Sequence, residues 1–201
     1  MQTACLTGGV ATGKSEFVRL FTHERTDVDA FDCDRAVHGL LAEPAMAAQV
    51  EAALGRPLAG CEGGIDRKVL REIVFADASA RLTLEALLHP EVRRLCLAAR
   101  DQAAATPGVR LFLAEVPLLY ESAFDVARDY EIVVASSPAT QRSRLQERRR
   151  IDPATAERIL SAQLPMLQKV ERADIVVWNG GSLECLKRQA HYLRKRLGLP
   201  S

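Results

Sequence analysis

The chain has 201 residues, of which 48% are hydrophobic and 26% charged, and its 27 lysines and arginines against 26 aspartates and glutamates leave a formal net charge of +1. This composition indicates a globular protein of one domain, or of one domain with a substantial insertion, and excludes a disordered chain, a collagen-like repeat and a membrane protein. The near-neutral charge argues against a nucleic-acid-binding domain, which usually carries a basic excess.

The chain opens on a short apolar run at residues 3–7, which predicts a buried strand. Residues 8–15 then read Gly-Gly-Val-Ala-Thr-Gly-Lys-Ser, the pattern of a phosphate-binding loop, and a helical pattern follows. Glycines let the backbone turn its N–H groups around a β-phosphate, and the helix start adds partial positive charge. We expect Lys14 to reach the β- and γ-phosphates and the Ser15 hydroxyl to take one coordination position of Mg²⁺.

The second candidate strand, residues 28–31, is weaker and is followed by Asp32-Cys33-Asp34. Residues two apart on an extended chain point to one side, and ligands of an open parallel sheet lie beyond the carboxyl ends of its strands. Asp32 and Asp34 are therefore expected beside the phosphate loop, where a carboxylate accepts the proton of an attacking hydroxyl or holds Mg²⁺ through water. The alternative is that Asp34 only caps a helix beginning at Arg35.

Residues 35–106 contain no predicted strand and at least three helical stretches, with Gly60, Glu62, Gly63 and Gly64 in a loop. Pro44 fits a helix start, Gly55 a helix end and Asp66 an N-cap, while Pro90 is expected to begin another helix. We interpret this stretch as a helical insertion into an α/β core formed by residues 1–34 and 107–201.

Two further apolar runs, residues 111–114 and 132–135, predict the third and fourth strands. Glu115 and Glu121 follow the third strand and are candidates for the same sheet edge as the phosphate loop. Tyr120 lies between them and is expected to be a packing group.

Arginines are dense after the fourth strand, at positions 142, 144, 148, 149 and 150. Arg144 and Arg148 are four residues apart and share a helix face, and Asp152-Pro153 fits the start of a further helix. The arginines predict a lid over about residues 142–165 that closes over a nucleotide. A solvated helix face and an RNA-binding patch are the alternatives.

The last apolar run, residues 175–178, predicts the fifth strand and leads into Asn179-Gly180-Gly181. This turn is a candidate for contact with an adenine ring, and an ordinary turn before the next helix is the alternative. Trp178 is expected to be a packing group. Strand thus alternates with helix on both sides of residues 35–106, which predicts a parallel sheet with helices on its faces.

Cysteine usage and targeting signals indicate where the protein works. The five cysteines are odd in number, widely spaced and form no Cys-x-x-Cys pair, so they predict neither a disulfide framework nor a zinc site. No cleavable apolar leader is present, and no apolar run approaches the roughly 18 residues that cross a membrane. We expect a cytoplasmic protein that binds no membrane.

In combination, these segments resemble the dephospho-coenzyme A kinase family. The resemblance covers nearly the whole chain, in residues 6–15, 32–34, 63–67, 88–92, 116–121, 137–138, 173–176, Arg144, Arg148 and Gln163. It implies a P-loop fold of three α/β/α layers with a five-stranded parallel sheet, a helical substrate domain and a lid. It also implies transfer of the ATP γ-phosphoryl group to the 3′-hydroxyl of the ribose in dephospho-coenzyme A, with Mg²⁺.

The resemblance implies roles for individual residues. The catalytic residues would be Lys14, Asp34 as the base with Asp32 beside it, and Arg144 from the lid. The nucleotide would be held by Gly8, Gly9, Ala11, Thr12, Gly13, Lys14, Ser15, Glu16, Arg148 and Asn179. The acceptor would contact Asp34, Arg67, His89, Pro117 and Leu118, although from its sequence context alone His89 fits a buried hydrogen-bonding residue better. We expect dephospho-coenzyme A as the partner, no nucleic acid, and a monomer or weak homo-oligomer.

Some positions depart from the family's usual pattern. Glu16 replaces a common hydroxyl residue, Trp178 replaces a small polar or acidic one, and Arg149 and Arg150 replace an acidic stretch. The alternative functions are another small-molecule kinase, resembling shikimate or nucleoside kinases, and a nucleotide-binding switch or adaptor without transfer. The sequence lacks the guanine-reading Asn-Lys-x-Asp motif, and the long helical insertion suits a bulky acceptor.

Overall fold

The computed structural model describes residues 1–58, 60, 64–122 and 124–200, apart from the side chains of residues 148 and 149. The chain forms two compact units, one of Met1–Phe31 with Ala99–Ser201 and the other of Asp32–Ala98. No helix within the described ranges is long and apolar enough to cross a membrane.

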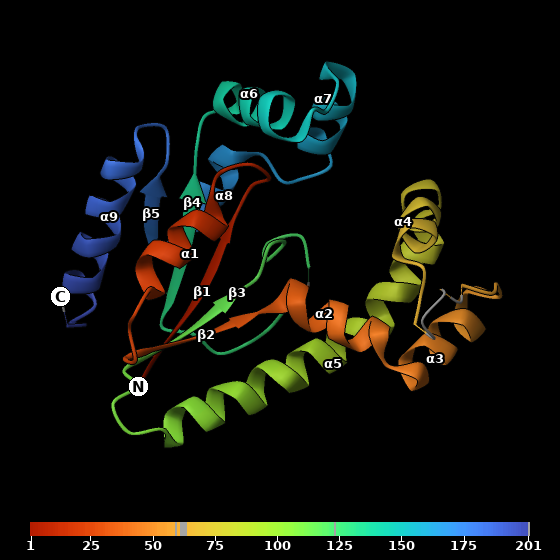
Figure 1. Ribbon diagram of the computed structural model, residues 1–201, viewed down its shortest axis with the longest axis horizontal. Coiled ribbons are helices and arrows are strands. Elements are labelled where there is room, and N and C mark those ends of the chain that lie inside the picture. The colour runs from red at the N-terminus through yellow and green to blue at the C-terminus, as the bar shows by residue number, and fades with distance from the viewer. Residues whose placement is uncertain (59, 61–63, 123, 201) are drawn as a thin grey trace. The chain divides into compact units, whose positions relative to one another are not determined.

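A five-stranded parallel sheet in the order β2-β3-β1-β4-β5 forms the centre of the first unit (Figure 1). Its strands are β1 (Gln2–Gly8), β2 (Val28–Asp32), β3 (Leu111–Glu115), β4 (Tyr130–Ala135) and β5 (Ile175–Trp178). Every residue of β3 is buried, as in a parallel sheet covered on both faces. All five predicted strands are confirmed, and with them the predicted α/β fold class.

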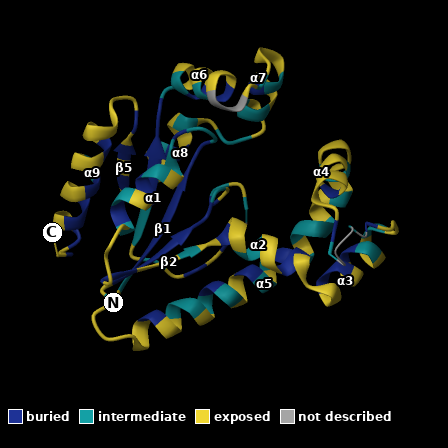
Figure 2. Ribbon diagram, in the orientation of Figure 1, coloured by how far each residue is buried: buried dark blue, intermediate teal, exposed yellow. Residues whose placement is uncertain are grey.

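Helices α1 (Lys14–Thr22), α8 (Met166–Arg172) and α9 (Leu183–Arg196) lie along this sheet, with exposed residues on their outward sides (Figure 2). Helices α6 (Pro138–Arg149) and α7 (Pro153–Ser161) lie beyond the carboxyl ends of the strands (Figure 1). Phe17 and Phe21 of α1 stack with ring centroids 5.5 Å apart and pack into the same core as Leu186 and Leu193 of α9. This packing fixes the direction of α1, and therefore the position of the loop that precedes it.

The second unit is helical and contains α2 (Cys33–Ala42), α3 (Pro44–Leu54), α4 (Arg67–Ala76) and the first part of α5 (Ala78–Ala105). The predicted terminal residues are confirmed: Pro44 begins α3, Gly55 ends it with a φ of 63°, and the Asp66 carboxylate accepts the Lys68 and Val69 amides of α4. Over the described part of 35–106 there are helices and no strand. The predicted loop residues Glu62 and Gly63 lie outside the described residues.

One prediction about a helix start was wrong, and one alternative about a helix cap is excluded. Pro90 lies inside the single helix α5, because the buried Leu88, Val92 and Cys96 give that helix an apolar face that continues across the proline. The cap of the helix after β2 is Asp32, whose carboxylate accepts the Arg35 amide at 3.1 Å. Asp34, offered as an alternative cap, instead lies in the first turn of α2.

Candidate active site

The phosphate loop connects β1 to α1 and has the backbone geometry that its glycines allow. Ala11 and Gly13 have positive φ angles of 58° and 87°, and the Thr12 hydroxyl donates to the Gly9 carbonyl at 2.9 Å. A Cβ on Gly13 would lie 2.3 Å from the Asn179 amide nitrogen, so only glycine fits there. Gly13 also caps α1 without a side chain, which leaves the first amides of the helix available to an anion.

Two side chains donate hydrogen bonds to backbone carbonyl oxygens of the phosphate loop. Arg144 of α6 donates to the carbonyl oxygens of Ala11 and Thr12 at 3.2 and 3.1 Å, and the Asn179 side chain donates to the Thr12 carbonyl at 2.8 Å. Arg144 also donates to the Asn179 carbonyl at 3.0 Å. These bonds place α6 and the turn after β5 against the loop and fix the direction in which its carbonyls point.

Lys14 begins α1 and forms an ion pair with Glu115 at the end of β3, with 3.3 Å between Nζ and Oε2. The two side chains are largely buried, being 15% and 11% exposed. β3 neighbours β1 in the sheet, and this pairing brings the two residues together across 101 positions of the chain. Glu115 was predicted as a candidate for this sheet edge, and its partner Lys14 was not predicted.

Other predicted nucleotide residues have different surroundings. Ser15 is exposed, and among the described residues its hydroxyl has no hydrogen-bond partner. Glu16 pairs with Arg19 one turn further along α1, 2.6 Å away. The Arg148 side chain lies outside the described residues. Trp178 is half exposed at the end of β5, so its prediction as a packing group was wrong; edge strand β5 buries only its alternate residues, Ile175 and Val177.

The predicted acceptor residues fall in both units. Pro117 and Leu118 belong to the first, where the Thr7 hydroxyl of β1 donates to the Pro117 carbonyl at 3.2 Å. Asp34, Arg67 and His89 belong to the second unit, in α2, α4 and α5.

A hollow of about 530 Å³ lies within the second unit. Its lining includes His38, Leu41, Ile65, Asp66 and Arg67. The Asp66 carboxylate caps α4, and Arg67 and His38 beside apolar residues suit a ligand that combines negative charge with an uncharged part.

The fold and the loop together define a class of protein. The first strand of the parallel sheet runs through an anion-binding loop into a helix, and the lysine of this loop lies beside a glutamate at the end of a neighbouring strand. This arrangement defines a P-loop phosphotransferase fold with its nucleotide site.

Comparison with known proteins makes the assignment specific. A family model described as Dephospho-CoA kinase matches residues 3–184. A protein named Dephospho-CoA kinase from Anaeromyxobacter dehalogenans is 40% identical over 197 residues, covering 96% of this chain and 90% of its own. The chain therefore belongs to the dephospho-CoA kinase family, as its motifs predicted.

Solved structures agree in fold. The crystal structure of TT1252 from Thermus thermophilus has a TM-score of 0.80 at 26% identity, covering 98% of this chain and 97% of its own. The dephospho-CoA kinase from Campylobacter jejuni has a TM-score of 0.69 at 23% identity, with 97% and 96% covered.

Proposed function

We propose that this protein transfers the γ-phosphoryl group of ATP to the 3′-hydroxyl of the ribose in dephospho-coenzyme A, releasing ADP and coenzyme A. The observation that carries the proposal is the phosphate loop, with a largely buried Lys14 and with carbonyls bound by Arg144 and Asn179, in a chain that matches the family over residues 3–184. The hydroxyl oxygen forms a bond to the γ-phosphorus, the bond to the β,γ-bridging oxygen breaks, and the hydroxyl proton passes to a base.

Lys14 is the residue that changes partner when the nucleotide binds. Before binding, its ammonium is neutralised by Glu115 at 3.3 Å. A triphosphate in the loop offers several anionic oxygens to the same ammonium, at a helix start that also favours anions. Lys14 then stabilises charge on the transferring group, and Arg144 keeps the loop in its binding conformation.

The residues at this site suit Mg²⁺ bound together with the nucleotide. Among the described residues no three acidic, histidine or cysteine side chains form a cluster that holds a metal alone. Mg²⁺ instead takes one or two protein oxygens, phosphate oxygens and water, and the exposed Ser15 hydroxyl and the Glu115 carboxylate are oxygen donors of that kind. When bound, the ion neutralises phosphate charge.

On the acceptor side, we assign the general base to Asp34. Both Asp32 and Asp34 are exposed, Asp32 as the cap of α2 and Asp34 in the first turn of the same helix, and the family resemblance assigns the base to Asp34. The acceptor would contact Arg67 and His89 in the second unit and Pro117 and Leu118 in the first. Arg67 lines the hollow of that second unit, which suits the bulk of a coenzyme A precursor.

The test is an acceptor assay with the purified full chain, Mg-ATP and dephospho-coenzyme A. We expect equal amounts of ADP and coenzyme A to form, and much weaker turnover with shikimate or a nucleoside. Hydrolysis of ATP without phosphorylated acceptor would contradict the proposal. Comparing the affinity for ATP with the affinity for GTP distinguishes an ATP-dependent kinase from a guanine-nucleotide switch.

We also propose that the protein acts in the cytoplasm, as a monomer or weak homo-oligomer, without nucleic acid. Light scattering after size-exclusion chromatography would measure its mass, and a tight tetramer would contradict this.

A further inference from the structure

Two glutamines hold the peptide groups on either side of Val10 in the phosphate loop. The Gln141 side-chain amide donates to the Val10 carbonyl at 2.7 Å, and the Gln163 side-chain carbonyl accepts from the Val10 amide at 2.9 Å. Gln141 belongs to α6 and Gln163 to the segment between α7 and α8, at 131 and 153 positions from Val10 in the chain. Val10 is thus bound on one side by Gln163, which lies within the predicted lid of residues 142–165, and on the other by Gln141, which directly precedes that lid.

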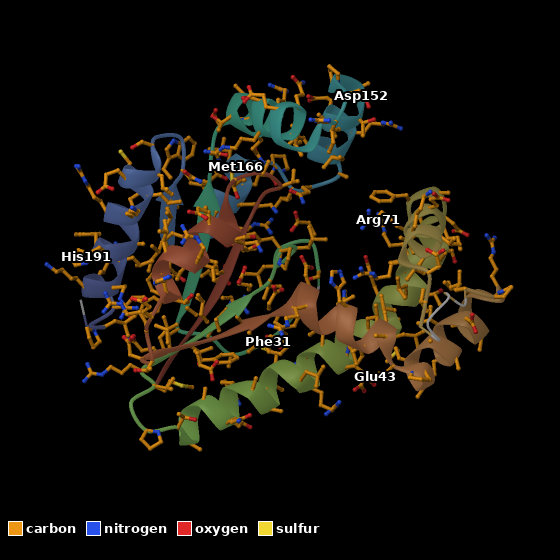
Figure 3. The ribbon with its side chains drawn as sticks, viewed as in Figure 1. Phe31, Glu43, Arg71, Asp152, Met166 and His191 are labelled. Atoms are coloured by element: carbon orange, nitrogen blue, oxygen red, sulfur yellow. The ribbon has the colours of Figure 1, made fainter. Side chains whose placement is uncertain are left out.

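The neighbouring glycine allows these bonds to form. A Cβ on Gly9 would lie 2.6 Å from the Gln141 amide nitrogen and 2.7 Å from the methyl carbon of Met166. Met166 begins α8, beside the phosphate loop in Figure 3. A side chain at position 9 would therefore displace the Gln141 amide group or the Met166 methyl group from the loop.

A second set of bonds fixes the segment that carries Gln163. The next residue, Leu164, donates its amide to the Glu121 carboxylate at 2.9 Å, and the same carboxylate lies 2.7 Å from the buried ammonium of Lys169. Glu121 follows β3, so the segment is tied both to the phosphate loop and to the chain after β3. Gln163 therefore accepts the Val10 amide from a fixed position.

We propose that Gln141 and Gln163 are positioning residues for nucleotide binding, which set the phosphate loop by holding Val10 from opposite sides. Because Gln141 donates and Gln163 accepts, the two residues need opposite hydrogen-bonding chemistry. Neither residue touches the transferring group in this role. The effect is on nucleotide affinity and thus precedes the transfer step of the proposed function.

Because the two glutamines need opposite hydrogen-bonding chemistry, the same substitution, glutamine to glutamate, is made at each position in a separate variant. Gln163→Glu keeps an oxygen that accepts from the Val10 amide. Gln141→Glu places a carboxylate oxygen against the Val10 carbonyl and leaves that carbonyl without its donor. Each variant adds one negative charge beside Val10, so the comparison between them reports on the hydrogen bond. Gln146→Glu makes the same change at an exposed position of α6 and serves as the control.

The measurement is the equilibrium Kd for Mg-ADP by calorimetry, which needs no acceptor and no turnover. We expect the Kd of Gln141→Glu to exceed that of Gln163→Glu by about tenfold or more, with Gln146→Glu within about twofold of the wild type. In steady-state assays with ATP the same variants should change KM more than kcat. Equal Kd values for the first two variants, in proteins with wild-type urea midpoints, would overturn the proposal.

Amide hydrogen exchange at Val10 is a second readout, useful if Gln141→Glu folds poorly. In the nucleotide-free protein, Gln163→Leu should accelerate exchange of the Val10 amide by at least about tenfold, while Gln163→Glu should leave it protected. Unchanged protection in Gln163→Leu would contradict the role of Gln163. Failure of the acceptor assay would contradict the proposed function, and neither binding nor exchange depends on that assay.

Discussion

The ammonium of Lys14 lies 3.3 Å from the Glu115 carboxylate, and both side chains are largely buried. The pair joins the start of α1 to the end of the neighbouring strand β3, and it neutralises a lysine whose charge is largely desolvated. Glu115 therefore stabilises the nucleotide-free protein, and a polyphosphate takes over part of that role when it binds.

Glu115→Gln should lower the free energy of unfolding of the nucleotide-free protein by about 1 to 3 kcal/mol, since Lys14 loses its counter-charge while remaining partly desolvated. Saturating ADP should stabilise the variant more than it stabilises the wild type, because the phosphates replace the missing anion. Urea unfolding with and without ADP measures both effects. Glu184→Gln, in an exposed pair with Lys187, should change stability by less than about 0.5 kcal/mol.

Asp34→Asn should lower kcat by about 10²- to 10⁴-fold, because an amide cannot accept the proton of the attacking hydroxyl. Asp29→Asn, an exposed position in β2, is the matched control and should retain near-normal kcat. Steady-state assays at saturating ATP and acceptor make the comparison. A kcat within a factor of about 3 of the wild type for Asp34→Asn would rule out the base role, and a larger loss in Asp32→Asn would assign it to Asp32.

Arg144→Lys should reduce kcat/KM for ATP by about 10- to 100-fold, because an ammonium cannot reproduce the guanidinium's bonds to three carbonyl oxygens of Ala11, Thr12 and Asn179. Arg142→Lys is the control on the same helix, since Arg142 is exposed and pairs only with Glu157 among its described contacts. It should stay within about twofold of the wild type. Comparable losses in both variants would show that guanidinium groups of α6 in general, rather than the bonds of Arg144 to the loop, explain the effect.

Asp27→Asn should lower the free energy of unfolding by about 3 to 5 kcal/mol. Asp27 and Arg194 form a buried pair at 2.7 Å, and Arg194 also donates to the Phe21 carbonyl, so its charge would be left inside the core. Equilibrium urea unfolding at neutral pH measures the loss. Arg194→Met in the Asp27→Asn background should restore part of the stability by removing the unpaired charge, and no recovery would contradict this explanation.

Features encoded within a few residues were predictable from the sequence. Asp66 and Asp152 cap α4 and α7 as expected, because a carboxylate next to free amides at a helix start acts locally. The alternation of apolar runs with helical patterns likewise predicted the five strands and the parallel sheet. Pro90 marks the limit of such local signals, since packing of its neighbours in α5 overrides its tendency to break a helix.

By itself the sequence determined the phosphate loop, because Gly13, Lys14 and Ser15 are adjacent and their chemistry depends on the backbone between them. Only the tertiary structure decided which side chains hold that loop. Glu115, Gln141 and Gln163 reach it from 100 or more positions away, through strand order and helix packing. A glutamine or glutamate carries no sequence signal for a partner so distant, and its role therefore follows from the fold that brings the two together.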